Sequence, residues 1–526
     1  MDRAGQIVET TSGPVRGACE DGLHIFRGIP FAAPPVGELR WLPPQPVASW
    51  REVRPATEFG PSSPQNPVVV PMPNDLVRVD GEQSEDCLYL NVCTPGIDGA
   101  RRPVMVWIHG GGFILGAGRQ DISHPAHLAR TGNTVLVTIN YRLAGFGFLR
   151  LVDVTGGAIP ATGNEGMLDQ IAALEWVRDN VERFGGDPGN VTIFGESAGG
   201  MSVGTLFGMP AAEGLYRRGI LQSGACQTVH PVELANRVGA GVLELLGVDP
   251  DDTGAIRALR AQQLLDLEAR LSSPETSSPQ LGMTPFQPCV DGATLPVNPL
   301  EAVRAGAVAG IDMLIGSTLE EYKPFAEVFP GLSEMDFAAL VERMSVEAAR
   351  LMEGDRRGDI ETLVQGYRYA CAERGLEAAP PDLMLTLEGD RVFWMPAVLL
   401  AEAQAPHPGR TYNYVFTWES PWNGGSLGAC HGLEIGFVFG TIDVTRSREF
   451  HGEGPEAHAL EAFCQAAWLN FARTGNPSGG IVGDWPEYGV DRATMLLGAE
   501  QSVALDFASD ERHAWRAAGY PGVGRL

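Results

Sequence analysis

Residues 191–200 read V-T-I-F-G-E-S-A-G-G, and this stretch constrains the fold more than any other part of the chain. Its first four residues are β-branched or aromatic and predict a short buried strand. Gly195 and Gly199 leave room for a sharp turn around Ser197, and residues 201–207 can continue as a helix. A strand that passes through such a turn into a helix lifts the serine hydroxyl above the sheet. Ser197 is therefore the candidate nucleophile.

The pattern G-x-S-x-G occurs three times in the sequence, so the pattern alone does not identify a site. Ser202, between Gly200 and Gly204, falls within the helix expected after Ser197. Ser426 lies in a glycine-rich loop that no strand leads directly into. Only Ser197 combines the strand, the turn and the helix, and this context selects it.

The size and composition of the chain describe a globular protein with a large core. Its 526 residues suit one elaborated α/β unit, and we expect a single domain over residues 1–526. The composition, 44% hydrophobic and 20% charged, is typical of such proteins. The net charge of −27 argues against nucleic acid and anionic membrane surfaces as partners. A solvated acidic surface explains this charge more simply than steering of cationic substrates, although the sequence leaves both open.

The sequence carries no recognisable targeting signal or metal motif. The first residues, M-D-R-A-G-Q, lead directly into a strand-like segment and do not resemble a secretory signal. No apolar run approaches the roughly 18 residues that a membrane-spanning helix needs. The eight cysteines show no C-x-x-C spacing, which favours reduced thiols over a metal site. These features predict a cytoplasmic protein without a bound metal.

Strands and helices alternate along the chain, which predicts an α/β fold with a largely parallel sheet flanked by helices. Strand-like segments follow one another at 88–92, 104–108, 134–139, 191–194, 220–222 and 313–315, and the last strand of the sheet is expected at 412–416. Helical periodicity is found at 167–184 and over about 455–473. The proline-rich stretch 61–87 predicts a long surface loop, and residues from about 324 to 410 predict a mostly helical insertion.

The sequence H-G-G-G-F at 109–113 directly follows a predicted strand. Consecutive glycines expose backbone N–H groups with no side chains in the way, and such groups stabilise a developing oxyanion. The glycine run is therefore a candidate oxyanion hole. A further donor would be the N–H of Ala198, the residue after the candidate nucleophile.

A serine hydroxyl needs a base that takes its proton and an acid that orients the base. In a fold of this kind the expected chain order is serine, acid, histidine. The exit of the strand at 313–315 offers two acids, Glu320 and Glu321. The histidines that follow are His407, His431, His451, His458 and His513. His431 is favoured because a glycine-rich loop joins it to a late strand, but the residues alone leave the choice open.

A series of long motifs resembles the type-B carboxylesterase family, which includes bacterial p-nitrobenzyl esterases, liver carboxylesterases and cholinesterases. The motifs include G-I-P-F-A at 28–32, S-E-D-C-L-Y-L-N at 84–91, N-Y-R-L-A-G-F-G-F at 140–148, G-N-E-G-M-L-D-Q at 163–170, F-G-G-D-P-G-N-V-T at 184–192, H-G-L-E-I-G-F-V-F-G at 431–440 and W-L-N-F-A-R-T-G-N-P at 468–477. So many motifs in one order are far more specific than any one of them. The resemblance implies an α/β-hydrolase fold with a mostly parallel sheet, flanking helices and large insertions near the active site.

The resemblance also implies roles for individual residues. The implied triad is Ser197 as nucleophile, His431 as base and Glu321 as acid, so that Glu320 would point to solvent or cap the next segment. The implied oxyanion hole consists of Gly111, Gly112 and Ala198. The residues implied at the substrate are Glu196, on the alcohol side, and Phe286 with Pro288, near the acyl group. Ser223 resembles a serine that supports the histidine–glutamate pair, and the implied structural ion pairs are Arg40–Glu85 and Arg142–Asp169.

Two departures from the family pattern narrow the expected substrate and compartment. Residues 61–87 contain no tryptophan, so the aromatic platform that cholinesterases offer to a quaternary ammonium is missing. Secreted relatives pair the cysteine at the position of Cys87 with an upstream cysteine, and Ser62 and Ser63 stand where that partner is expected. Both departures favour a general bacterial intracellular esterase in which Cys87 is a free thiol.

We expect a serine carboxylesterase that hydrolyses small-molecule esters through an acyl-enzyme, without a metal or organic cofactor, as a monomer or small homo-oligomer. Hydrolysis of an amide or a carbamate by the same triad is the nearest alternative. A non-catalytic, cholinesterase-like binding protein is a more distant one, because such a protein would be expected to lack the serine or the histidine.

Overall fold

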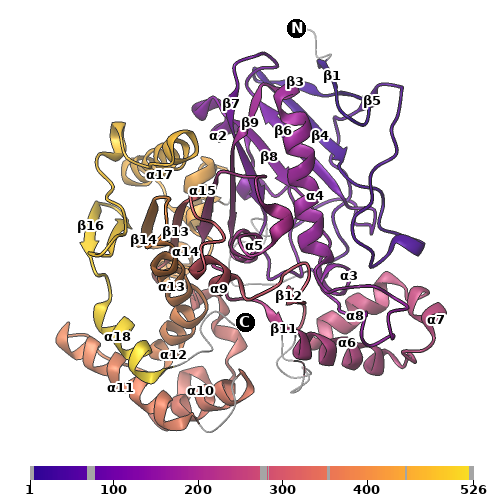
Figure 1. Cartoon of the computed structure of the whole chain (residues 1–526). Helices are drawn as coiled ribbons and strands as arrows, with labels where there is room; N and C mark the ends of the chain where they lie inside the picture. The colour runs from indigo at the N-terminus through magenta and orange to yellow at the C-terminus, as the bar shows by residue number, and fades with distance from the viewer. Residues whose placement is uncertain are drawn as a thin grey trace.

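The computed structural model describes residues 5–67, 78–272, 281, 284–351, 356–444 and 447–519. Within them, one sheet of 11 strands runs through the molecule in the order β16-β15-β14-β13-β10-β9-β7-β8-β6-β4-β3 (Figure 1). Its strands are β3 (Ala18–Glu20), β4 (Leu23–Pro30), β6 (Tyr89–Thr94), β7 (Arg102–Ile108), β8 (Val135–Ile139), β9 (Gly186–Glu196), β10 (Arg218–Gln222), β13 (Asp312–Thr318), β14 (Thr411–Phe416), β15 (Ala493–Leu497) and β16 (Gln501–Leu505). Two small sheets consist of β1 (Ile7–Glu9), β2 (Pro14–Arg16) and β5 (Arg54–Pro55), and of β11 (His230–Pro231) and β12 (Cys289–Val290).

The centre of the large sheet is parallel, which confirms the predicted α/β fold class. Parallel pairing extends from β8 through β7, β9, β10, β13 and β14 to β15. The strands at both margins, β16 on one side and β6, β4 and β3 on the other, pair antiparallel. The central strands β7, β8 and β10 are buried along nearly their whole length because helices cover both faces of the sheet.

Strand β7 shows how the sheet serves two cores. Val104, Val106 and Ile108 belong to the core that contains helix α4 (Glu165–Asn180), whereas Met105 and Trp107 belong to the core that contains helix α17 (Pro455–Thr474). Successive side chains of a strand point to opposite faces, so both faces of β7 must be apolar.

Two groups of helices lie beyond the sheet, at the lower left and lower right of Figure 1. One group consists of α10 (Phe337–Leu351), α11 (Arg357–Glu373), α12 (Pro380–Gly389), a π-helical turn η7 (Asp390–Trp394), α13 (Met395–Gln404) and α18 (Ser509–Ala518). The other group consists of α6 (Val232–Leu246), α7 (Thr253–Arg257) and α8 (Ala261–Leu271). The first group has an apolar core of its own, to which α18 contributes Trp515.

The remaining helices are short and connect these parts. They are α2 (Ala126–Gly132), α3 (Ala144–Gly147), α5 (Ala198–Leu206), α9 (Pro299–Arg304), α14 (Trp422–Gly425), α15 (Glu434–Phe439) and α16 (Ser447–His451). Short 3₁₀ turns lie at η1 (Gly37–Leu39), η2 (Asp121–Ser123), η3 (Val181–Phe184), η4 (Pro210–Ala212), η5 (Lys323–Val328), η6 (Leu332–Glu334) and η8 (Gly480–Val482).

The strand predicted at 412–416 is present as β14, but the prediction that it ends the sheet is wrong. Strand β15 pairs parallel with β14, and β16 pairs antiparallel with β15 at the sheet edge. Both strands are five residues long, and β16 is largely exposed, so its sequence lacks the apolar run of a central strand. Of the loop predicted over 61–87, residues 68–77 lie outside the described residues.

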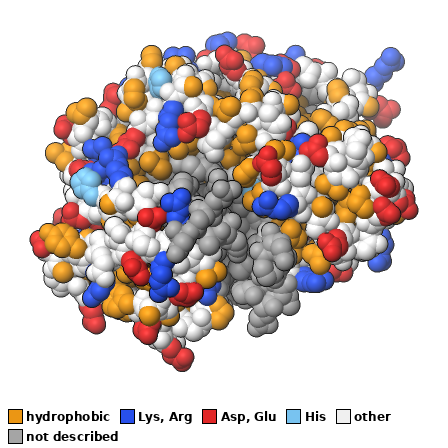
Figure 2. Space-filling model, turned by 60° about the horizontal axis from the view of Figure 1, so that its bottom comes forward, with side chains coloured by type: hydrophobic (Ala, Val, Ile, Leu, Met, Phe, Trp, Pro, Cys, Tyr) orange, Lys and Arg blue, Asp and Glu red, His pale blue; other side chains and the backbone are white. Residues whose placement is uncertain are grey.

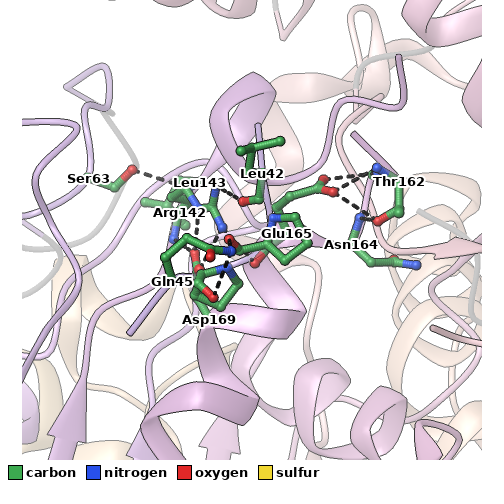
Figure 3. Close-up of polar contacts among 12 residues, drawn as sticks. Leu42, Gln45, Ser63, Arg142, Leu143, Thr162, Asn164, Glu165 and Asp169 are labelled. Carbon is green, nitrogen blue, oxygen red and sulfur yellow. Dashed lines mark hydrogen bonds and ion pairs between the residues drawn. The ribbon is translucent and has the colours of Figure 1, made fainter. Parts of the chain in front are cut away.

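The two predicted ion pairs are both present. Arg40 donates through Nε to Glu85 at 2.7 Å, and Arg142 donates to Asp169 through Nε at 2.8 Å and through Nη2 at 2.7 Å. Figure 3 shows the Arg142 guanidinium between the Asp169 carboxylate and the Leu42 carbonyl, to which it donates at 2.8 Å. The Arg142 and Asp169 side chains are at most 3% exposed, so each charge depends on the other for its solvation.

The expected free thiol at Cys87 is also present. All eight cysteines are unpaired, and Cys87 is completely buried, where burial raises the pKa of its thiol. The Ser63 hydroxyl forms a hydrogen bond with this thiol and accepts a second one from the Leu143 N–H at 3.2 Å. Ser63 therefore stands beside Cys87, where the secreted relatives were expected to place a cysteine. No helix among the described residues has the length and apolar character needed to cross a membrane.

Candidate active site

Five neighbouring parallel strands, β7, β9, β10, β13 and β14, deliver the candidate residues to one edge of the sheet. Their register aligns Ile108 with Gly195 and Glu196 with Gln222, and it aligns Gln222 with Gly316. The segments that leave these carboxyl ends carry the glycine run at 109–112, Ser197, Ser223, Glu321 and His431. A ligand site is expected at this edge of an open α/β sheet.

Ser197 occupies the strained turn between β9 and α5. Its φ of 56° and ψ of −126° are rarely adopted by a residue with a side chain. The glycines on either side permit this turn because there is no space for side chains. A Cβ at Gly199 would lie 2.0 Å from the Ile108 carbonyl oxygen, and one at Gly195 would lie 2.6 Å from the same atom. The Ser197 N–H donates to the Gln222 carbonyl at 2.9 Å, which fixes the turn to the neighbouring strand.

The other two serines of the pattern lie in different surroundings. Ser202 is fully buried within α5, and its hydroxyl accepts a hydrogen bond from the Gln170 side chain at 3.0 Å. Ser426 follows α14, a single helical turn with two residues in the left-handed region. Neither serine lies at a turn between a strand and a helix.

Glu321 lies against His431. Its Oε2 is 2.5 Å from Nδ1 of the imidazole, and its Oε1 accepts the Thr318 N–H at 2.7 Å. Because the carboxylate is held by the backbone at the end of β13, it can fix both the orientation and the tautomer of the ring. Nδ1 then carries the proton, which leaves Nε2 free to accept one.

The expectation that Glu320 points to solvent or caps the following segment is wrong. Glu320 Oε2 accepts the Ala429 N–H at 2.9 Å, and the Glu320 N–H donates to the Ala429 carbonyl at 2.9 Å. Its Oε1 also pairs with Lys323 at 2.6 Å. Glu320 therefore ties the loop that precedes His431 to the exit of β13, because this loop returns alongside the strand end.

The Nε2 side of His431 is occupied by a second carboxylate. Glu196 Oε1 lies 3.1 Å from Nε2, and no hydrogen bond joins Ser197 Oγ to His431 among the described residues. Glu196 immediately precedes Ser197 in the turn at the end of β9. Catalytic hydrogen bonds are often long or absent in unliganded enzymes and form only with substrate.

Three buried carboxylates surround the imidazole: Glu196, Glu321 and Glu434, which are 5%, 3% and 0% exposed as whole residues. Burial opposes the charged form of His431, but the charges of Glu196 and Glu321 and the hydrogen bond to Glu321 outweigh it and raise the pKa of the ring. Burial also raises the pKa of Glu196 and of Glu434. The charge of each of these two groups, Glu196 and His431, therefore shifts the pKa of the other.

The glycine run follows β7 as predicted. Gly111 and Gly112 have φ values of 107° and 61°, which turn the chain sharply. Among the described residues, no acceptor binds the N–H groups of Gly111, Gly112 or Ala198, so these donors remain available. His109 holds the start of the run, since its ring stacks on Tyr141 with centroids 4.4 Å apart, and burial lowers its pKa to about 4.

The structure places the remaining predicted residues near this edge with different contacts. Phe286 is buried and lies beside Gly145 in α3. The first residue of α3, Ala144, donates its N–H to the carbonyl of Phe113, which directly follows the glycine run. Pro288 is buried, and its carbonyl accepts the His230 N–H at 2.7 Å. Ser223 Oγ is buried without a hydrogen-bond partner among the described residues, so its support of the histidine–glutamate pair stays a prediction.

Three residues in the site were missed in the sequence. Glu434 lies three residues after His431, but its sequence position does not reveal that it is fully buried. Phe325 and Phe393 contact the His431 ring at centroid distances of 5.5 Å and 4.6 Å. Phe393 comes from the helical insertion, and no local signal marks it as part of the site. Among the described residues, no group of three or more His, Cys, Asp or Glu side chains is arranged to hold a metal ion.

The sequence matches the profile of the Carboxylesterase family over residues 4–515. It is 38% identical over 519 residues to para-nitrobenzyl esterase of Bacillus subtilis, an alignment that covers 96% of this chain and 98% of that protein. It is 35% identical over 511 residues to phenmedipham hydrolase of Pseudarthrobacter oxydans, with 95% and 97% covered. A solved carboxylesterase from Geobacillus stearothermophilus superposes with a TM-score of 0.84 at 37% identity, over 97% of this chain and 99% of that chain.

Proposed function

Since the chain belongs to the carboxylesterase family and is a carboxylic ester hydrolase, we propose that it cleaves esters through an acyl-enzyme formed on Ser197. In this proposal His431 is the general base and Glu321 is the acid that orients it. The observation that carries the proposal is the 2.5 Å contact between Glu321 and His431 Nδ1, on the same sheet edge as the strained turn at Ser197.

Acylation begins when His431 accepts the Ser197 proton at Nε2. The Ser197 oxygen bonds to the acyl carbon, and the carbonyl electron pair moves onto its oxygen. The N–H groups of Gly111, Gly112 and Ala198 stabilise this oxyanion, while Glu321 stabilises the imidazolium.

The tetrahedral intermediate then collapses, and the bond between the acyl carbon and the alcohol oxygen breaks. His431 gives its proton to the departing alcohol, which leaves the acyl group on Ser197. A water molecule next transfers a proton to His431 and attacks the acyl carbon. Release of the carboxylic acid returns the proton to Ser197 and restores the free enzyme.

The substrate contacts follow from the same arrangement. Glu196 faces the reacting side of His431 and is proposed to lie beside the alcohol group. Phe286 and Pro288 are proposed to lie on the acyl side, beyond the glycine run. The free cysteines support a cytoplasmic location, and a monomer or small homo-oligomer acting on small-molecule esters is the proposed form.

The face at the bottom of the molecule does not favour a cationic substrate. Figure 2 shows lysine and arginine side chains interspersed with acidic ones over this face. Neighbouring acidic and basic side chains partly offset one another, so this face is not a uniformly acidic surface that would attract cations. A solvated acidic surface therefore remains the simpler explanation of the net charge of −27.

A matched panel of p-nitrophenyl esters, p-nitroanilides and p-nitrophenyl carbamates should separate the proposed function from its nearest alternative. We expect the esters to be hydrolysed with a much higher kcat/KM than the anilides and carbamates of the same acyl size. A preference for an anilide or a carbamate would contradict the proposal. Ser197→Ala protein, prepared in parallel, reports any hydrolysis by a contaminant.

Replacing Glu196 with glutamine should move the acid limb of the kcat/KM profile to lower pH. His431 must be neutral to accept the serine proton, so the rate rises as pH passes through its pKa. The Glu196 charge raises that pKa, so removing this charge should move the acid limb to lower pH by about one pH unit. The exposed Glu419→Gln serves as the charge-matched control, since Glu419 lies in the loop before His431. An acid limb that stays at the same pH or moves to higher pH in Glu196→Gln would contradict this effect of the Glu196 charge on His431.

A further inference from the structure

The helix that begins at Pro380 contains a π-helical turn at Asp390–Trp394 before it continues as α13. The sequence supplies a cause, because Pro396 has no N–H to donate to the Val392 carbonyl and its ring would collide with that carbonyl in a regular helix. Such turns within α-helices are frequently found at functional sites. This one carries no residue that the proposed chemistry uses.

The turn nevertheless touches two of the three triad candidates. The Phe393 ring lies against the His431 imidazole, with centroids 4.6 Å apart and planes inclined by 39°. At the preceding end, Gly389 lies so close to Glu321 that an added Cβ would be 3.3 Å from the Glu321 Cβ. The position of the turn therefore helps to determine where both Glu321 and His431 lie.

A chain of two hydrogen bonds, one partly buried and one buried, holds the first residue of the turn. The Tyr367 hydroxyl of α11 donates to Asp390 Oδ2, and the Trp515 Nε1–H of α18 donates to the Tyr367 hydroxyl oxygen at 2.7 Å. An indole N–H can only donate, so the hydroxyl accepts from Trp515 and its own proton is directed to Asp390. Tyr367 and Trp515 are each 2% exposed, which leaves water little access to replace these bonds.

We propose that Asp390 is a positioning residue for ester hydrolysis: anchored by Tyr367 and Trp515, it fixes the π-helical turn that holds Phe393 against the His431 ring. The proposal rests on the proposed catalytic roles of His431 and Glu321. Asp390 touches no reacting atom and acts through Phe393. Trp515 of the C-terminal helix α18 is thereby linked to His431 through Tyr367, Asp390 and Phe393.

The charges around Asp390 are consistent with its proposed role as a positioning residue. Glu321 faces it from the exit of β13, Tyr367 faces it from α11, and Arg374 faces it from the residue directly after α11. Desolvation raises the pKa of Asp390 to about 7, and the charge of Glu321 adds to this effect. Near neutral pH this carboxyl group is therefore only partly ionised beside Glu321, and its oxygen accepts a hydrogen bond from the Tyr367 hydroxyl.

The test compares Asp390→Ala, Asp390→Asn and Tyr367→Phe with the wild-type enzyme, using p-nitrophenyl butyrate and counting active sites by titration. Loss of the anchor should lower kcat per active site in Asp390→Ala by about tenfold or more, because small misplacements of catalytic groups are costly. Tyr367→Phe removes only the hydroxyl and should lower kcat in the same direction. Asp390→Asn keeps an acceptor for Tyr367 and should retain kcat within about threefold.

A second measurement separates positioning from loss of stability. The pKa of His431 falls when Glu321 holds the ring less well. The acid limb of the kcat/KM profile should therefore move to lower pH by about half a pH unit in Asp390→Ala and Tyr367→Phe. The pKa of His431 also depends on Glu196 and Glu434, which these variants leave intact. Asp382→Asn, an exposed carboxylate on α12, is the matched control and should leave both kcat and the acid limb unchanged.

Three results would overturn the proposal. The first is that Asp390→Ala and Tyr367→Phe both keep the wild-type kcat and the wild-type position of the acid limb, while Ser197→Ala is inactive. The second is an Asp390→Asn variant as impaired as Asp390→Ala, since the hydrogen bond would then not be the cause. The third is an active Ser197→Ala, which would remove the proposed function itself and with it the role of Asp390.

Discussion

Ser197→Ala protein should fold normally but lose the ability to hydrolyse short p-nitrophenyl esters. We expect its kcat to be lower than the wild-type value by a factor on the order of 10⁶. Alanine keeps the Cβ and the backbone turn but removes the oxygen that is proposed to form the acyl-enzyme. The Ser197 N–H bond to Gln222 does not involve the side chain, so the turn at the end of β9 should persist. The measurement is kcat per folded molecule, with the thermal unfolding midpoint recorded for both proteins.

Two other serines provide matched controls. Ser202→Ala breaks a buried hydrogen bond with Gln170, which should cost about 1 kcal/mol of unfolding free energy and little activity. Ser426→Ala should change neither the unfolding free energy nor the activity. An active Ser197→Ala together with an inactive Ser202→Ala or Ser426→Ala would show that the nucleophile has been assigned to the wrong one of the three patterns.

Glu321→Gln should lower kcat on the order of 10⁴-fold, the loss typical of a neutralised triad acid. The amide can still contact His431 Nδ1, but it favours the tautomer with the proton on Nε2, which cannot accept the Ser197 proton. It also removes the charge that stabilises the imidazolium. The measurement is kcat at matched fractions of folded protein, because the Thr318 N–H keeps an acceptor in the variant.

Glu320→Gln is the control for the adjacent carboxylate. The amide oxygen can still accept the Ala429 N–H, and only the partly exposed pair with Lys323 is lost. Pairs of this kind contribute at most about 1 kcal/mol, so we expect kcat within about threefold of the wild-type value. The reverse outcome, an inactive Glu320→Gln and an active Glu321→Gln, would place the triad acid one residue earlier.

The sequence predicted the parts of the fold that have a local cause. The strand before Ser197, the glycines around it and the run after β7 each carry their own pattern, and the structure has β9, α5 and the turn at 109–112 in these places. The choice of Glu321 over Glu320 needed a family resemblance, because two adjacent carboxylates at a strand exit look alike in the sequence. The structure places Glu321, and not Glu320, against His431.

The features that the sequence did not reveal depend on tertiary contacts. Phe393 lies 38 residues before His431 in the chain and reaches it only because the helical insertion packs back onto the sheet edge. Glu434 looks like an ordinary acidic residue at the start of a helix, and its burial follows from the packing of α15 against α17. Strand β16 was missed because an exposed edge strand needs no apolar face.

Covalent labelling of the intact enzyme by a small organophosphate tests the central proposal most directly. An activated serine attacks the phosphorus, and the stable product reports which hydroxyl is the nucleophile. The proposed mechanism predicts one label per chain, complete loss of ester hydrolysis in proportion to labelling, and a peptide map that places the label on Ser197. A label on another residue, or full activity in protein labelled at Ser197, would contradict it.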